Sequence, residues 1–313
     1  MRITNRMMVD NAILNTADSM EKMNKLQNQV STGKLFQNAS EEPVRASLSL
    51  SLHSTLRTVD SYVDTTSNTS DWMNASDYAF SQMQDIANRA TTLIQRGLND
   101  TISDSERATS LGTEMQTLVN QAVETGNTAQ NGQYIFSGYQ INTKPFVVEN
   151  DATQTPFNDQ FGNIGVIPQK VTYNGDQGTM QRSLGPDQTV TLNVRGDQAL
   201  QGFIQNLQTA SEALIKKPYD TTSLQTALAG LQSSMSTMDQ YRTSNGARLR
   251  QVGSAADFLD QVKIETTSLL SQKENANVAE GISSLANQKT TYQAVLEVSQ
   301  RAISALSLFD YLK

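Results

Sequence analysis

The sequence contains no cysteine among its 313 residues. This absence excludes disulfides, thiolate metal ligands and cysteine nucleophiles, but it leaves the compartment open because the chain is indifferent to redox conditions. Aromatic residues make up only 6% of the chain, charged residues 18% and hydrophobic residues 37%. Much of the polarity comes from Gln, Asn, Ser and Thr. This composition favours long solvated helices with narrow apolar seams over one compact globule.

Clusters of basic residues and long apolar runs are also missing. The net charge is −7 and the 24 Lys and Arg residues are scattered, which argues against a nucleic-acid partner because neutralising a phosphate backbone needs clustered cations. No run approaches the roughly 18 apolar residues that cross a bilayer, so no membrane partner is expected. Polar residues at 5, 6, 10 and 11 interrupt any apolar stretch of a cleavable signal peptide. Composition alone favours a cytosolic protein.

The residues that enzymes and metal sites require are scarce. His53 is the only histidine, so serine–histidine catalysis and multi-histidine metal sites lack partners, and we expect it to be solvated or at the edge of a seam. Asp257 and Asp260 are interpreted as a charged helix face. The oxygen ligands within 150–159 do not have calcium-loop spacing, and 195–197 (Arg-Gly-Asp) is interpreted as a turn leading into a helix. We predict no catalysis, no cofactor and no metal.

Apolar residues recur at helical spacing near both ends of the chain, with coiled-coil-like gaps of three, four or seven. Isolated helices of this length are marginal in water. We therefore expect both termini to be mobile in a free subunit and to become helical on assembly. The predicted assembly-interface residues are Ile3, Met7, Leu14, Val30, Val278, Ile282, Leu285, Tyr292, Leu296, Ile303, Leu306 and Phe309.

Between the ends, the sequence predicts further helices. Gly33 is expected to stop the first helix, and a second is expected to start with Ser40 as its N-cap and Pro43 in its first turn, and to run to about Leu98. Although Leu48–Leu52 alternate as a strand would and residues 65–70 are weak helix formers, the longer three-four pattern favours one helix. Ser103 and Glu106 predict a capping box that opens a third helix, ending near 131–132.

Helical periodicity disappears from 133 to 195, where most of the prolines lie. Strands are predicted at 147–148, 166–167, 171–173 and 189–194, with Asn174-Gly175 as a hairpin turn. Helices are expected to resume after an N-cap at Asp197, to stop at Pro218, and to continue from about 222 to 241. A loop is then predicted at 242–246, before the last long helical region.

The predicted fold is mainly α with a small β insertion. The N- and C-terminal halves form a long antiparallel helical bundle or coiled coil, with a β-rich domain in the middle. We predict three parts: a terminal coiled-coil domain from 1–40 and 274–313, a helical-bundle domain from 41–144 and 197–273, and an inserted β-rich domain at 145–196.

Several segments resemble bacterial flagellar hook–filament junction proteins, also called hook-associated protein 3, which are relatives of flagellin. The most specific segment is GQYIFSG at 132–138, followed by TKPF at 143–146. The others are MRITN at 1–5, STG at 31–33, ASEEP at 39–43, RTSNGARL at 242–249 and LSLFDYL at 306–312. Nothing between 147 and 195 adds to the likeness. Pro43, in place of the Asp-Asp-Ala-Ala-Gly type of run of filament flagellins, is closer to the junction proteins.

The resemblance implies a structural axial protein of the flagellum that assembles as a homo-oligomeric ring between another hook-associated protein and the first flagellin subunits. It also implies type III export without a cleaved signal peptide, an extracellular location, and a cytoplasmic chaperone that covers the C-terminal helix. The alternative is another helical interaction protein, such as flagellin itself, a type III tip component or a soluble signalling coiled coil.

Overall fold

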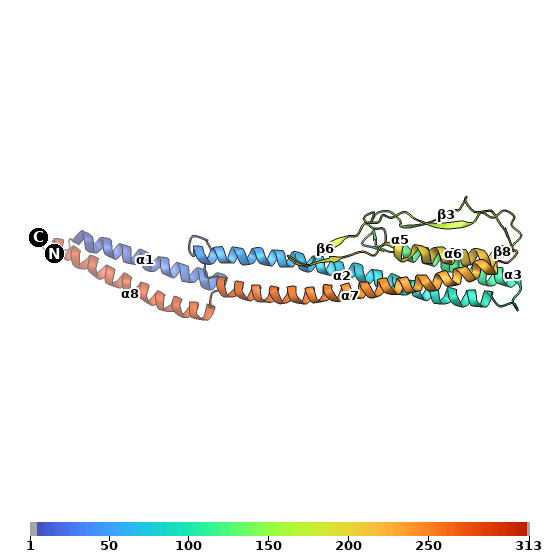
Figure 1. The fold of residues 1–313 in the computed structure, drawn as a ribbon. Helices are drawn as coiled ribbons and strands as arrows, with labels where there is room; N and C mark the ends of the chain where they lie inside the picture. Colours follow the sequence, from blue (N-terminus) through green and yellow to red (C-terminus); the bar gives the residue numbers. More distant parts are fainter. Residues whose placement is uncertain (1–4, 312–313) are drawn as a thin grey trace. The chain divides into compact units, whose positions relative to one another are not determined.

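The computed structural model describes residues 5–311, and side chains for residue 7 and residues 9–301 (Figure 1). Its contacts divide the chain into two compact units. Unit 1 comprises the described parts of Met1–Asp60 and Gln261–Lys313, and unit 2 comprises Ser61–Asp260. The chain is mainly helical with a strand-rich middle region, so the predicted fold class is confirmed.

Unit 1 contains the helices nearest both ends of the chain. Helix α1 (Asn5–Thr32) stops at Gly33, whose φ of 68° is the left-handed conformation expected of a helix-ending glycine. Helix α2 (Pro43–Gly97) opens on its proline as predicted. The predicted N-cap is wrong, because the Ala46 amide donates to the Glu42 carbonyl and Ser40 lies outside the helix. Proline at the first helical position needs no amide partner, which places the start at Pro43 itself.

Helix α2 is continuous through the threonine-rich segment that made its prediction uncertain. The hydroxyls of Thr65, Thr66 and Thr69 each donate to the backbone carbonyl four residues earlier. These bonds satisfy the hydroxyls within the helix, so they do not compete with its backbone ladder. The longer apolar periodicity therefore predicted the continuity of α2 correctly.

In unit 2, the segment after α2 begins with the predicted cap. The Ser103 hydroxyl accepts the Glu106 amide, 3.2 Å away, at the start of α3 (Asp104–Glu106). A π-helical segment, η1 (Arg107–Gly112), and helix α4 (Thr113–Gly126) follow. The apolar residues that recur at helical spacing along this segment are buried, namely Leu111, Met115, Leu118 and Ala122. The π-helical turn was not predicted, since apolar spacing does not report a single inserted residue.

After the strand-rich region, the chain returns to helices α5 (Gly196–Ala199), α6 (Gln201–Ile215) and α7 (Thr221–Glu274), with α8 (Val278–Tyr311) last. Asp197 is not an N-cap, since its carboxylate pairs with Arg195. The loop predicted at 242–246 is also wrong, because α7 is continuous there. Within unit 2, Arg242 binds Asp77, and the side-chain amide of Asn245 donates to the Met73 carbonyl, 2.9 Å away.

The strands form four antiparallel pairs. The pairs are β1 (Ala129–Gln130) with β2 (Gln133–Tyr134), β3 (Phe146–Asn150) with β5 (Gln169–Tyr173), β4 (Asn158–Asp159) with β8 (Lys216–Lys217), and β6 (Gln181–Ser183) with β7 (Thr189–Thr191). This confirms strands at 147–148, 171–173 and part of 189–194, whereas 166–167 contributes only a bridge between Val166 and Phe157.

The predicted hairpin turn at Asn174-Gly175 is wrong, because β5 pairs back to β3 and not to the strand that follows it. The hairpin lies instead at Asn131-Gly132, between β1 and β2, where the sequence predicted only the end of a helix. Both residues have positive φ, 51° and 78°, as a type I′ turn requires.

Replacing Gly132 with alanine is expected to destabilise unit 2 by about 1–2 kcal/mol, the cost of holding a side chain at positive φ. A β-carbon there would have no atom within 4 Å, so backbone strain is the only new cost. Gly253→Ala is the control: it also meets open space, but within helix α7, and should stabilise by about 0.5–1 kcal/mol. Urea unfolding measures the change in the free energy of unfolding for both variants. Equal changes in the two variants would contradict the assignment of the turn at Asn131-Gly132.

The core of unit 2 joins its helices to the strand-rich region. Phe80 of α2 meets Phe136 edge to face, with ring centroids 5.5 Å apart. Phe146 of β3 and Val171 of β5 belong to the same buried cluster as Phe203 of α6. The strands therefore pack on the helices of their own unit, which is the support that a β segment too small to be stable alone requires.

Candidate assembly surface

Helices α1 and α8 of unit 1 lie side by side and antiparallel (Figure 1). The side-chain amide of Gln288 donates to the Ser19 hydroxyl, 3.0 Å away, and the Thr16 and Ser299 hydroxyls are 3.5 Å apart. Seven residues of α1 that are buried or half-buried follow one another at gaps of three and four, which is the heptad spacing of a coiled coil: Val9, Ala12, Thr16, Ser19, Met23, Leu26 and Val30.

The seam between these helices is narrow and partly polar. Hydroxyls and an amide occupy positions where a stable coiled coil carries leucine or isoleucine. At one end, Gly281 lets α8 approach α1 closely, since a β-carbon there would be 2.9 Å from Val30 Cγ2. Such a seam holds two helices in register but buries little apolar surface, which favours a pair that gains stability from further partners.

The predicted interface residues fall on two different faces. One group has half-buried side chains: Val30, Leu285, Tyr292 and Leu296. The outward residues are Met7, Leu14, Val278 and Ile282, with exposures of 56%, 65%, 42% and 54%. Ile3 lies outside the described residues, and so do the side chains of Ile303, Leu306 and Phe309.

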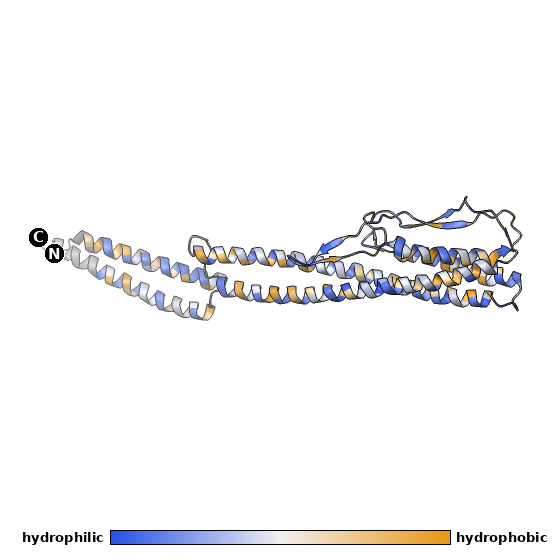
Figure 2. Ribbon diagram, in the orientation of Figure 1, coloured by the Kyte–Doolittle hydropathy of each residue, from blue (hydrophilic) through white to orange (hydrophobic). Residues whose placement is uncertain are grey.

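Three outward apolar residues escaped the prediction: Ile13, Met20 and Val298, with exposures of 59%, 48% and 67%. In Figure 2, apolar residues recur among polar ones along both α1 and α8. Their gaps from the other outward residues, six, one and six along 7, 13, 14 and 20, are not those of one helical stripe, so apolar periodicity gives no signal for them. The exposed apolar residues of α1 and α8 are together called the open face below; they are Met7, Ile13, Leu14, Met20, Val278, Ile282 and Val298.

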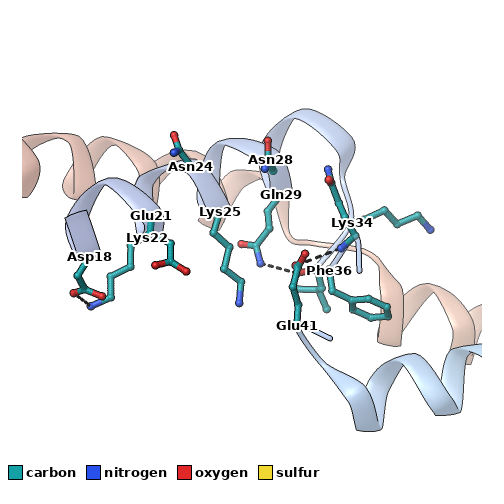
Figure 3. A pocket seen from close by; sticks show the side chains of 12 residues that line it. Asp18, Glu21, Lys22, Asn24, Lys25, Asn28, Gln29, Lys34, Phe36 and Glu41 are labelled. Carbon is teal, nitrogen blue, oxygen red and sulfur yellow. Dashed lines mark hydrogen bonds and ion pairs between the residues drawn. The ribbon is translucent and has the colours of Figure 1, made fainter. Parts of the chain in front are cut away.

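A polar groove of about 520 Å³ lies between α1 and the segment that follows it (Figure 3). Its wall includes the ion pair Asp18–Lys22, and the amide of Gln29 donates to the Leu35 carbonyl, 2.7 Å away. Burial raises the pKa of Glu41, but hydrogen bonds from Asn38 and the nearby charge of Lys25 outweigh it, so the pKa lies below its ordinary value. The groove is charged and open to solvent, which suits a polar segment of a neighbouring chain.

The residues considered for chemistry have structural partners. His53 is half-exposed and its Nε2 lies 2.8 Å from a Glu274 oxygen, which fits the predicted position at a seam edge. Asp257 and Asp260 are exposed on α7, as interpreted. Arg195 and Asp197 form an ion pair, so both charged ends of the Arg-Gly-Asp tripeptide are engaged within the chain.

The acidic residues of the strand-rich region cap their own turns. Asp151 accepts hydrogen bonds from Thr153 and Gln154, and Asp159 accepts two from Asn163. Hydrogen bonds from Thr153 are the main reason that the pKa of Asp151 is lowered. Among residues 5–311, no group of three or more acidic, histidine or cysteine side chains is arranged to hold a metal ion. No described helix has the length and apolarity of a membrane span.

Comparison with known proteins agrees with this arrangement of helices. The family description of the bacterial flagellin N-terminal helical region matches residues 3–141. Over these residues, the chain is similar to the N-terminal helical region of bacterial flagellin. The match includes α1, α2, α4 and the β1–β2 hairpin, so the resemblance noted in the sequence is confirmed there.

Two curated relatives of the flagellin-like chain bear the name flagellar hook-associated protein 3. The protein from Escherichia coli (strain K12) is 31% identical over 150 residues, which are 48% of this chain and 47% of the relative. The protein from Salmonella typhimurium is 31% identical over 147 residues, 47% of this chain and 46% of the relative. The match therefore spans about half the length of these relatives, and their names describe structural proteins of the flagellum and not enzymes.

Solved structures share the fold. A putative flagellar hook-associated protein from Vibrio parahaemolyticus superimposes with a TM-score of 0.63 at 13% identity, covering 75% of this chain and all of that one. Bacillus cereus FlgL has a TM-score of 0.57 at 18% identity, covering 71% of this chain and 99% of that one. At these identities the likeness establishes the fold alone, over about three quarters of this chain.

Proposed function

We propose that this chain is a structural axial protein of the bacterial flagellum, which forms the junction between a hook-associated ring and the flagellin filament. The observation that carries the proposal is the open face of α1 and α8, seven exposed apolar side chains on helices with a thin, partly polar seam. Exposed apolar side chains that gather into a patch mark surfaces that meet another protein, and on paired helices such a patch can be completed by a neighbouring copy. The names of the curated relatives agree with this role.

The finer parts of the proposal follow from the resemblance. Copies of the chain form a homo-oligomeric ring through their terminal helices, with another hook-associated protein on one side and flagellin on the other. A cytoplasmic chaperone covers the C-terminal helix before export, and export proceeds without a cleaved signal peptide. The three-part division into a terminal coiled coil, a helical bundle and a β-rich insertion belongs to this proposal as well.

Electron microscopy of labelled protein on detached flagella tests the location directly. The expected result is label at one place, between hook and filament. Label along the whole filament would favour flagellin itself, and no label on flagella would favour another helical interaction protein. Glu41-Glu42-Pro43, at the start of α2, argues for the first outcome over the second.

The open face can be tested separately with Ile282→Gln, which makes an exposed apolar side chain polar. We expect co-assembly with flagellin to weaken about tenfold or more, since burying an isoleucine contributes about 1.5–3 kcal/mol. The unfolding of the free chain should not change, because Ile282 is 54% exposed there. Asn287→Gln, an exposed polar change on the same helix, is the matched control. Sedimentation of mixtures with flagellin measures co-assembly, and equal behaviour of both variants would refute the role of this face.

A further inference from the structure

A single carboxylate holds three segments of unit 1 together. One oxygen of Glu274, the last residue of α7, accepts from Lys34 Nζ at 2.7 Å, in the connection between α1 and α2. The other accepts from the Ser49 hydroxyl and lies 2.8 Å from His53 Nε2, both on the first turns of α2. The Glu274 side chain is only 14% exposed. Charge-assisted hydrogen bonds of this kind are among the stronger polar interactions in proteins.

The backbone around Glu274 forms hydrogen bonds with the same connection between α1 and α2. The Leu35 amide donates to the Glu274 carbonyl at 2.7 Å, and the Ala276 amide donates to the Gly33 carbonyl at 2.8 Å. Helices α1 and α7 therefore both end here, and the residues that follow them, Lys34 and Asn275, form an antiparallel β-bridge. We call this set of contacts the clasp; it consists of residues 33–35 and 274–276 with Ser49 and His53.

The clasp lies at one end of the α1–α8 pair, beside the start of α2 and the end of α7. On one side, α1 and α8 share the partly polar seam of Thr16, Ser19, Gln288 and Ser299. A seam of this composition opens readily, since few buried apolar contacts oppose the entropy of the unfolded chain. The clasp concentrates one ion pair, three further side-chain bonds and two backbone bonds on a few residues.

We propose that Glu274 fixes the point at which opening of the α1–α8 pair stops in the free chain, by keeping the connection after α1, the start of α2 and the end of α7 in one place. Opening then runs along α1 and α8 up to the clasp and leaves α2 and α7 helical. The inference concerns the free subunit and goes beyond the proposed assembly role.

The Glu274 carboxylate of the clasp is charged over the ordinary pH range. Burial raises the pKa of Glu274, but the hydrogen bonds from Lys34, Ser49 and His53 outweigh it and bring the pKa down to about 2. Because this pKa is lower than the ordinary value of 4.5, the contribution of the carboxylate is full above that value and is lost as the pH falls through 2. The groups that face it are Lys34, His53 and Ser49, with Asn275 sharing Lys34. Substitution, and not a mild change of pH, is therefore the informative test.

Hydrogen exchange on the full-length free chain tests the proposal. In the unaltered chain, the amides of Leu35 and Ala276 are expected to exchange slowly, and those within 9–26 and 284–299 quickly. Glu274→Gln keeps the shape of the side chain and removes its charge. In this variant, we expect exchange at Leu35 and Ala276 to rise about tenfold or more, and the boundary of fast exchange to move into 43–56.

Two further variants separate the clasp from general effects. Glu265→Gln removes an exposed carboxylate from the same helix and should leave every rate unchanged. Lys34→Met removes the ion pair but leaves the bonds from Ser49 and His53, so its increase should be smaller than that of Glu274→Gln. Limited trypsin digestion gives an independent readout: cleavage at Lys22 and Lys25 in all chains, with rapid cleavage at Arg45 only in the clasp variants.

Three results would overturn the proposal. The first is unchanged exchange at Leu35 and Ala276 in Glu274→Gln. The second is slow exchange throughout 9–26 in the unaltered chain, since there would then be no opening to stop. The third is loss of protection across unit 2 in Glu274→Gln, which would make Glu274 a residue of global stability and not of a local boundary.

Discussion

A chain that ends at Asn277 is expected to lose co-assembly with flagellin completely, while unit 2 keeps its fold. The deletion removes α8, and with it the whole partner of the α1 seam and three residues of the open face, Val278, Ile282 and Val298. The two buried clusters of unit 2 contain no residue beyond Ala255. Its stability should therefore not depend on the missing helix.

The measurement has two arms. Sedimentation with flagellin measures incorporation, and urea unfolding followed by the fluorescence of Trp72 measures unit 2, since this tryptophan belongs to its core. A chain with residues 150–167 shortened, which leaves both terminal helices intact, is the control and should still co-assemble. Normal co-assembly of the truncated chain would contradict the proposal that the terminal helices form the junction.

The sequence predicted the long helices because their evidence is repetitive. Along α2, residues such as Met73, Phe80, Met83, Ala87 and Ile94 recur at helical spacing and are buried. Many such positions outweigh a few weak helix formers, so the continuity of α2 could be predicted through its threonines. The same redundancy explains the correct face of α4.

Single local signals were less reliable, and the dipeptide Asn-Gly shows why. At Asn131 it forms a hairpin turn, at Asn174 it follows a strand that pairs elsewhere, and at Asn245 it lies inside helix α7. The choice depends on distant partners: the Asn245 side chain donates to the Met73 carbonyl, and β5 finds its partner in β3. No window around these dipeptides contains that information.

The candidate surface was predicted in part for a related reason. The spacing of apolar residues identifies both ends as helical, but it does not separate a face that meets α8 from one that meets nothing within the chain. Val30 and Leu14 belong to different faces, although both fitted the helical pattern. The clasp at Glu274 was missed altogether, because its partners lie 221 or more residues away in sequence.

Several polar side chains of unit 2 bind backbone groups. Among them, we expect the substitution of Arg107 to lower the free energy of unfolding most. Its guanidinium donates to the carbonyls of Gly97 and Asn99 at 2.9 Å and pairs with Asp104 at 2.7 Å. It also lies 4.2 Å from the ring centroid of Tyr219. The side chain is only 7% exposed, so one planar group satisfies the carbonyls at the end of α2 and links them to the segment before η1.

Arg107→Met should therefore destabilise unit 2 by about 1–3 kcal/mol, because it removes one of two donors from each of these carbonyls, which keep the Tyr219 hydroxyl and the Ile102 amide, while preserving most of the side-chain volume. Arg107→Lys should recover only a small part, since an ammonium does not reproduce the fork of donors. Arg96→Met is the control: Arg96 is 57% exposed and pairs with Glu106 at 3.4 Å, so its loss should cost less than about 1 kcal/mol. Urea unfolding of the three variants measures the change in the free energy of unfolding. If the change for Arg107→Met is as small as that for the control, water replaces the guanidinium at these carbonyls.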